Sequence, residues 1–130
     1  MTKKDAMSER RKFERAVFTL EDSVIGVLSV PGIHDRSIQT NILNVSEGGI
    51  QFTLEAQNKH KIRAGDRIVV LQIKAPATLK FLVNIDAEVK WVLHPDMFEL
   101  AGAGCQFINI SPSSREQIAA FVEAWNESRK

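Results

Sequence analysis

The sequence has little of several features that mark common protein classes. It has no tyrosine, a single cysteine at Cys105, no run of about 18 apolar residues and no signal-peptide pattern. A lone cysteine cannot form an internal disulfide, so we expect a cytoplasmic protein. Because no apolar run is long enough to span a bilayer, we expect no insertion into a membrane. The net charge of only +1 argues against a general binder of nucleic acid polymers.

Motifs of catalysis are also missing. The chain contains no phosphate-binding loop, no Gly-x-Gly-x-x-Gly fingerprint and no Gly-x-Ser-x-Gly elbow. His34, His60 and His94 lack the close partners typical of a zinc site. Cys105 lies in a predicted strand, where a small buried residue is favoured over a nucleophile. We therefore predict a protein that is not an enzyme and holds no metal or cofactor.

The small net charge conceals an uneven distribution. Residues 1–15 hold six basic and three acidic residues, whereas the rest of the chain holds 11 basic and 13 acidic ones. The 130 residues suit one domain, because single domains most often have about 100–150 residues. We predict a flexible tail at residues 1–9 and one domain at 10–126 that begins with a basic arm at 10–15.

Strand patterns fill most of this domain. Residues 49–54 alternate strictly, with Ile50, Phe52 and Leu54 on one face. From Leu79 to Leu93 every odd position is apolar, Trp91 included, which predicts core-facing side chains along a bent strand or a strand pair. Further strands are expected at residues 17–20, 24–30, 37–43, 68–73, 97–100 and 104–110.

The end of the chain is expected to be helical. Ser113 and Glu116 have the spacing of a capping box, and Ile118, Phe121 and Trp125 follow at helical spacing. This predicts an amphipathic helix at about residues 113–126 that covers the sheet. Short strands without a β/α rhythm predict a small six- or seven-stranded antiparallel β-barrel with a C-terminal helix.

Two polar groups of residues are candidates for a binding site. The first comprises the arginines Arg10, Arg11 and Arg15, and guanidinium groups bind phosphate bidentately or stack on a base. Its alternative is a solvated basic arm.

The second group comprises Asn44, Ser46, Gly48 and Gly49. Asn44 and Ser46 offer hydrogen-bonding groups for a base edge, and the glycines allow the backbone to approach a ligand. Its alternative is a plain Asx turn that closes a hairpin.

At these spacings the two groups resemble the motifs of the PilZ domain family, bacterial receptors for the second messenger cyclic di-GMP. The family pattern Arg-x-x-x-Arg matches Arg11 to Arg15, and Asp/Asn-x-Ser-x-x-Gly matches Asn44 to Gly49. Three shorter segments extend the resemblance over roughly residues 9–125: 64–66, 89–91 and 102–107. Asn44 replaces the commoner aspartate, which removes a charge from the position that reads the base.

The resemblance implies a ligand and a set of roles. Arg11 and Arg15 would bind phosphate and the Hoogsteen edge of guanine, and Asn44 and Ser46 would contact a guanine edge or the arginines. Gly49, with Gly48, would leave room for the base. A basic residue at position 10 accompanies an intercalated ligand dimer in the family. Binding would order the arm and regulate a protein effector in motility, biofilm formation or polysaccharide output.

Two other functions stay open at this point. One is a PilZ-like adaptor that binds proteins and no nucleotide, although the intact motifs argue against it. The other is a barrel that binds single-stranded nucleic acid, which needs exposed aromatic platforms. Tyrosine is absent, and most phenylalanines fall on predicted core-facing positions.

Overall fold

The computed structural model describes residues 14–30, 37–55, 62–75, 80–93 and 100–128. The predicted tail at 1–9, Arg10 and Arg11 lie outside these residues. The elements are β1 (Arg15–Val17), the 3₁₀ helix η1 (Leu20–Asp22), β2 (Ile25–Ser29), β3 (Ser37–Ser46), β4 (Gly49–Glu55), β5 (Arg67–Lys74), β6 (Lys80–Leu93), β7 (Leu100–Phe107) and α2 (Pro112–Ser128).

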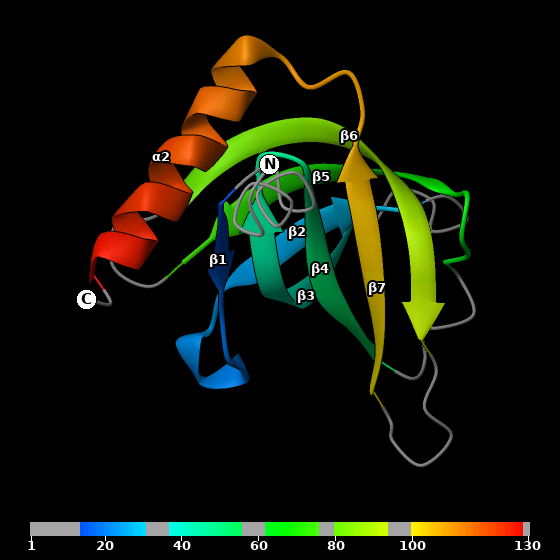
Figure 1. Cartoon of the computed structure of the whole chain (residues 1–130). Coiled ribbons are helices and arrows are strands. Elements are labelled where there is room, and N and C mark those ends of the chain that lie inside the picture. Colours follow the sequence, from blue (N-terminus) through cyan, green and yellow to red (C-terminus); the bar gives the residue numbers. More distant parts are fainter. Residues whose placement is uncertain (1–13, 31–36, 56–61, 76–79, 94–99, 129–130) are drawn as a thin grey trace, which may run out of the picture.

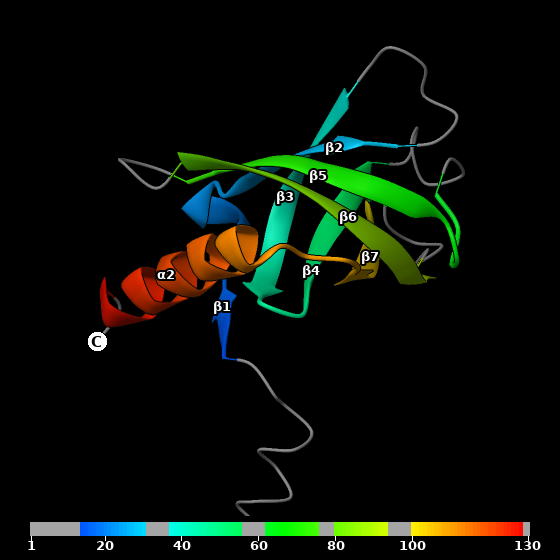
Figure 2. The ribbon, with the colours of Figure 1, turned by 90° about the horizontal axis from the view of Figure 1, so that it is seen from above.

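The strands form one antiparallel sheet in the order β1-β3-β2-β5-β6-β7-β4, and a further pairing of β3 with β4 closes it. The closed ring therefore has six strands, with β1 attached to β3 as a seventh (Figure 1). Helix α2 lies along one side of the barrel, next to β1 (Figure 2). This confirms the predicted fold class.

Strands β1 and β2 follow one edge of β3 in succession. Val17 is in register with Asn44, and Ile25 with Asn41. Between them the chain leaves the edge, because the Thr19 N–H donates to Asp22 Oδ2 at 2.7 Å and turns the backbone into η1. The predicted strand at 17–20 was therefore wrong: β1 ends at Val17, and Leu20 begins a 3₁₀ turn.

The core fills the barrel with the alternating side chains expected of a half-buried sheet. Ile50, Phe52 and Leu54 are buried, as the alternation in residues 49–54 predicted. The described part of the core is almost entirely apolar, and Thr40 is its one buried polar residue. The Thr40 hydroxyl donates to the Thr53 carbonyl oxygen, so its burial leaves no unpaired donor.

Strand β6 is a single long strand that arches across the barrel (Figure 1). Val89 pairs with Cys105 but Trp91 pairs with Gly104, so one extra residue, Lys90, forms a bulge in β6. Past this bulge the alternation changes phase. Val92 packs against the core and Leu93 is 61% exposed. The predicted core-facing positions of Trp91 and Leu93 were therefore wrong.

The last predicted strand also differs from the observed one. Strand β7 ends at Phe107, before the predicted end at residue 110, and Asn109 has a left-handed φ of 52°. The predicted segment 97–99 lies outside the described residues.

Helix α2 begins one residue before the predicted start. The Ser111 hydroxyl accepts the Ser114 N–H at 3.1 Å, so Ser111 caps the helix and Pro112 takes its first position. Proline is favoured there because its ring presets the helical φ and no N–H is lost. The prediction that Ser113 forms the cap was wrong, because a serine two residues earlier meets the same need.

The buried face of α2 packs against Phe18, the residue that follows β1. Ile118, Phe121 and Val122 are buried, and the Phe18 ring lies 4.8 Å from the Trp125 ring, edge to face. The Phe18 and Phe121 centroids are 5.8 Å apart. Aromatic contacts of this kind contribute about 0.5–1.5 kcal/mol beyond burial, so β1 and α2 are held together.

Gly49 is required by the close approach of β4 and β7. A Cβ at this position would overlap the carbonyl oxygen of Cys105. We expect Gly49→Ala to lower the free energy of unfolding by about 1–3 kcal/mol, as overpacking usually does, measured by chemical denaturation. In the control Gly102→Ala, the nearest atoms lie 3.8 Å from the new Cβ, and we expect a change within about 0.5 kcal/mol. Equal losses in the two variants would contradict this account of Gly49.

Candidate functional site

One row of outward-facing residues crosses five neighbouring strands of the barrel. Val17 pairs with Asn44, Asn44 with Gln51, Gln51 with Gly104, and Gly104 with Trp91. We call these five residues the outer row. The row places a side-chain amide pair near its middle and an indole at one end, with Arg15 two residues from Val17 on β1.

Asn44 joins the outer row because β3 contains an extra residue. Ile42 pairs with Phe52 and Asn44 with Gln51, so Leu43 has no opposite residue on β4. Ile42 and Val45 both face the core, although they are three residues apart. Without this shift Asn44 would share the inner face with Ile42.

Trp91 joins the row because of the bulge at Lys90, and its indole packs on Gly104. The indole lies over Gly104, where a Cβ would overlap the ring. Trp91 is half-buried and Gly104 is buried beneath it. The barrel therefore presents an aromatic ring on its outer face.

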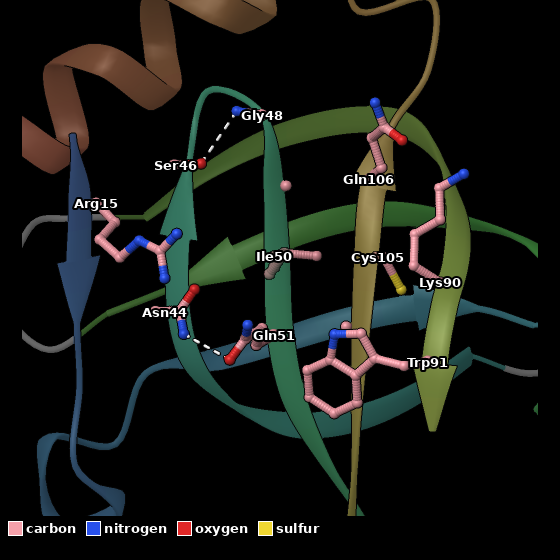
Figure 3. Close-up of a pocket in the computed structure, with 12 residues that line it drawn as sticks. Arg15, Asn44, Ser46, Gly48, Ile50, Gln51, Lys90, Trp91, Cys105 and Gln106 are labelled. Carbon is pink, nitrogen blue, oxygen red and sulfur yellow. Dashed lines mark hydrogen bonds between the residues drawn. The ribbon is translucent and has the colours of Figure 1, made fainter. Parts of the chain in front are cut away.

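Four residues of the outer row, all except Val17, form the floor of an open recess of about 230 Å³ (Figure 3). We call this cavity the recess. Of its lining residues, Arg15 and Lys90 are cationic, and none of those in the described part of the chain is a carboxylate. The lining residues are Arg15, Asn44, Ser46, Gly48, Gly49, Ile50, Gln51, Lys90, Trp91, Gly104, Cys105 and Gln106.

The two cations flank the floor and differ in how they are held. Arg15 is exposed, and its guanidinium extends towards Asn44 (Figure 3). Its backbone is fixed, because Asn126 Nδ2 donates to the Arg15 carbonyl oxygen at 3.2 Å. Lys90 Nζ lies 3.0 Å from Glu88 Oε2 in an exposed ion pair. Such pairs contribute little, so Lys90 is free to exchange this partner for an anion.

The polar side chains of the predicted turn have separate tasks. The Ser46 hydroxyl accepts the Gly48 N–H at 3.1 Å and stabilises the turn between β3 and β4. Asn44 Nδ2 donates to Gln51 Oε1 at 2.8 Å. The side chain of Asn44 therefore does not close the turn, and its amide faces the recess.

Five of the predicted site residues line the recess together: Arg15, Asn44, Ser46, Gly48 and Gly49. Arg10 and Arg11 lie outside the described residues. Gln51, Lys90 and Trp91 also line the recess but were not among the predicted site residues. The outward phase of Gln51 was visible in its alternation, whereas that of Trp91 depends on a bulge that the uninterrupted apolar pattern hid.

The thiol of Cys105 lies beneath the recess and is buried. Burial raises its pKa to about 12, because the apolar surroundings disfavour the thiolate. Among the residues that the structure describes, no group of three or more His, Cys, Asp or Glu side chains could hold a metal ion. Within the same residues, no helix has the length and apolar character that a membrane crossing requires.

The fold and the recess define a small β-barrel domain with a polar site on its outer face. Residues 9–124 match the PilZ domain family, and the chain therefore belongs to this family. No curated protein matches the chain in sequence.

Solved structures share the fold at low sequence identity. The inhibitor of motility MotI/DgrA of Bacillus subtilis has a TM-score of 0.69 and 16% identity, over 93% of this chain and 53% of that one. The PilZ domain of YcgR from Escherichia coli with c-di-GMP has a TM-score of 0.68 and 16% identity, over 92% and 94%. The K. pneumonia MrkH–c-di-GMP complex has a TM-score of 0.66 and 17% identity, over 93% and 56%. This chain thus spans about half the length of MotI/DgrA and MrkH.

The contact between Trp91 and Gly104 predicts a spectroscopic change. In Gly104→Ala the new methyl group would displace the indole towards solvent. In a Trp125→Phe background, where Trp91 is the remaining tryptophan, we expect a red-shifted emission and stronger quenching by acrylamide. Gly102→Ala, which has room for its methyl group, should leave both signals unchanged. Unchanged emission in Gly104→Ala would contradict the position of the indole.

The raised pKa of Cys105 predicts an unreactive thiol. Alkylation needs the thiolate, so iodoacetamide at pH 8 should modify the folded protein at least tenfold more slowly than the protein in denaturant. The rate of the folded protein should rise with pH up to about 12, if the fold persists there. Equal rates in the folded and denatured protein at pH 8 would exclude burial of this thiol.

Proposed function

We propose that this PilZ domain binds cyclic di-GMP in the recess and acts as a regulatory module without catalysis. The lining of the recess carries the proposal, because it combines cationic side chains, an amide pair and an aromatic ring around one open floor. The structures of YcgR and MrkH that share this fold contain c-di-GMP, which supports the choice of ligand.

Each part of the floor suits one part of a purine dinucleotide. Arg15 would bind a phosphate or the O6 and N7 atoms of guanine, as guanidinium groups do bidentately. The Ser46 hydroxyl accepts the Gly48 N–H and keeps its own hydrogen to donate to the ligand. Trp91 would stack on a base, an interaction that contributes about 1–3 kcal/mol.

The size of the recess indicates what else the ligand needs. Its 230 Å³ falls below the roughly 300–1,000 Å³ of pockets that enclose a drug-sized ligand. We propose that the recess receives one base with its phosphate, and that Arg10 and Arg11 bind the rest of the ligand. Arg10 would also contact a second, intercalated ligand molecule.

Ligand binding would be transmitted through β1. Arg15 lies on β1, its carbonyl oxygen is bound by Asn126, and Phe18 packs against Trp125. Order imposed on the arm before Arg15 would therefore reach α2 directly. We propose that a protein effector reads this change, with an output in motility, biofilm formation or polysaccharide production.

Calorimetry with cyclic di-GMP tests the proposal. Loss of an arginine contact to a charged group costs about 1.5–3 kcal/mol, so Arg15→Ala and Arg11→Ala should each weaken binding about tenfold or more. Arg67→Ala is the matched control, because Arg67 is also an exposed strand arginine but does not line the recess. A stoichiometry of two ligands per chain would support the intercalated dimer.

The other outcomes distinguish the alternative functions. A wild-type protein that binds no cyclic di-GMP at high micromolar concentration would favour the protein-binding adaptor. Binding of single-stranded oligonucleotides that falls with salt, without binding of the dinucleotide, would favour the nucleic-acid function. The half-buried Trp91 is one aromatic platform in a recess the size of one base, which fits a dinucleotide better than a polymer.

A further inference from the structure

Gln51 forms, with Asn44, the polar centre of the recess, although it lies outside both recognised motifs. The two residues are opposite each other on β4 and β3, both are half-buried, and both line the recess. Asn44 Nδ2 donates to Gln51 Oε1 at 2.8 Å (Figure 3). Neither side chain therefore presents itself alone to a ligand, and they act as one amide pair.

The hydrogen bond determines which groups of the pair stay available. A side-chain amide has one carbonyl oxygen and one NH₂ group. The bond uses the NH₂ of Asn44 and the oxygen of Gln51, so Asn44 Oδ1 can accept and Gln51 Nε2 can donate. The reversed bond, from Gln51 to Asn44, would leave the same complement of one acceptor and one donor.

One acceptor beside one donor matches both purines. Guanine offers its N1–H as donor and O6 as acceptor, and adenine offers its N6 amino group as donor and N1 as acceptor. A carboxylate at position 44 would differ, because it only accepts. The carboxylate would accept a hydrogen bond from the NH₂ group of Gln51, so the Gln51 oxygen would turn outward. The pair would then offer acceptors alone, and adenine N1, itself an acceptor, would have no donor opposite it.

We infer that the Asn44–Gln51 pair is a purine reader that accepts adenine as well as guanine, and that Gln51 is a specificity-determining residue of this site. The inference rests on the proposed function. Under the proposed function Arg15 binds O6 and N7 of a base, and this bidentate contact requires guanine. One of the two bases of the ligand must therefore be guanine. The site therefore takes cyclic dinucleotides with one guanine and one further purine, including the mixed guanine–adenine compound.

Calorimetry of the full chain with the diguanine, mixed and diadenine cyclic dinucleotides tests the inference. The wild type should bind the mixed ligand within about tenfold of the diguanine ligand and the diadenine ligand more weakly than both. Asn44→Asp and Gln51→Glu should each widen the gap between diguanine and mixed ligand by about tenfold or more, the discrimination that one good base contact provides. The ratio of two affinities in one variant is insensitive to a change in folding.

Matched controls make the same chemical changes elsewhere. Asn41→Asp changes a half-buried asparagine of β3, and Gln72→Glu a half-buried glutamine of β5, and neither residue lines the recess. Both should keep the wild-type ratio.

Rejection of the mixed ligand by more than about tenfold, with the diguanine ligand bound, would overturn the inference and leave the proposed function standing, since discrimination of that size is what one good base contact provides. The same holds if neither Asn44→Asp nor Gln51→Glu changes the ratio. Absence of binding to all three ligands would instead overturn the proposed function. If one of the two variants fails to fold, as a thermal melt would show, the other still decides.

Discussion

The site depends on two single residues that have no opposite partner in the sheet, Leu43 in β3 and Lys90 in β6. Because successive side chains of a strand point to opposite faces, each extra residue reverses every side chain beyond it. Asn44 and Trp91 consequently face outward, and Val45 and Val92 take the inward positions. Without these bulges an amide and an indole would enter the core, where the amide would need a buried partner.

The barrel and its C-terminal helix are coupled where the basic arm meets the sheet. Phe18 is buried against Phe121 and Trp125, and Asn126 binds the backbone of Arg15. Close-packed interiors transmit displacements and do not absorb them. A force on β1 therefore acts directly on α2, which also packs against β3 and β6.

The sequence predicted those features that depend on neighbouring residues. Alternation in residues 49–54 identified Ile50, Phe52 and Leu54 as core, and helical spacing identified Phe121 and Trp125 as the packed face of α2. Trp91 was assigned to the wrong face because Val92 and Leu93 are both apolar, so the pattern reads the same in either phase. The bulge is fixed by the pairing of β6 with β7, which local periodicity does not contain. The role of Gln51 likewise depends on its position opposite Asn44 in the sheet, which the sequence pattern of β4 does not reveal.

The openness of the recess has a consequence for affinity. A guanidinium in water gains little from an anion, because the high dielectric weakens the attraction and salt screens it. Arg15 is exposed, so its contact with a ligand strengthens only when something covers the recess. Among the described residues that line the recess, Trp91 offers one surface on which a base can stack, and none covers the opposite face of that base. Under the proposed function the cover comes from the basic residues before Glu14 or from a second stacked ligand, and both raise the affinity of the first ligand by excluding water. Ligand binding and the ordering of the arm are then one event, which is the property that a regulatory switch requires.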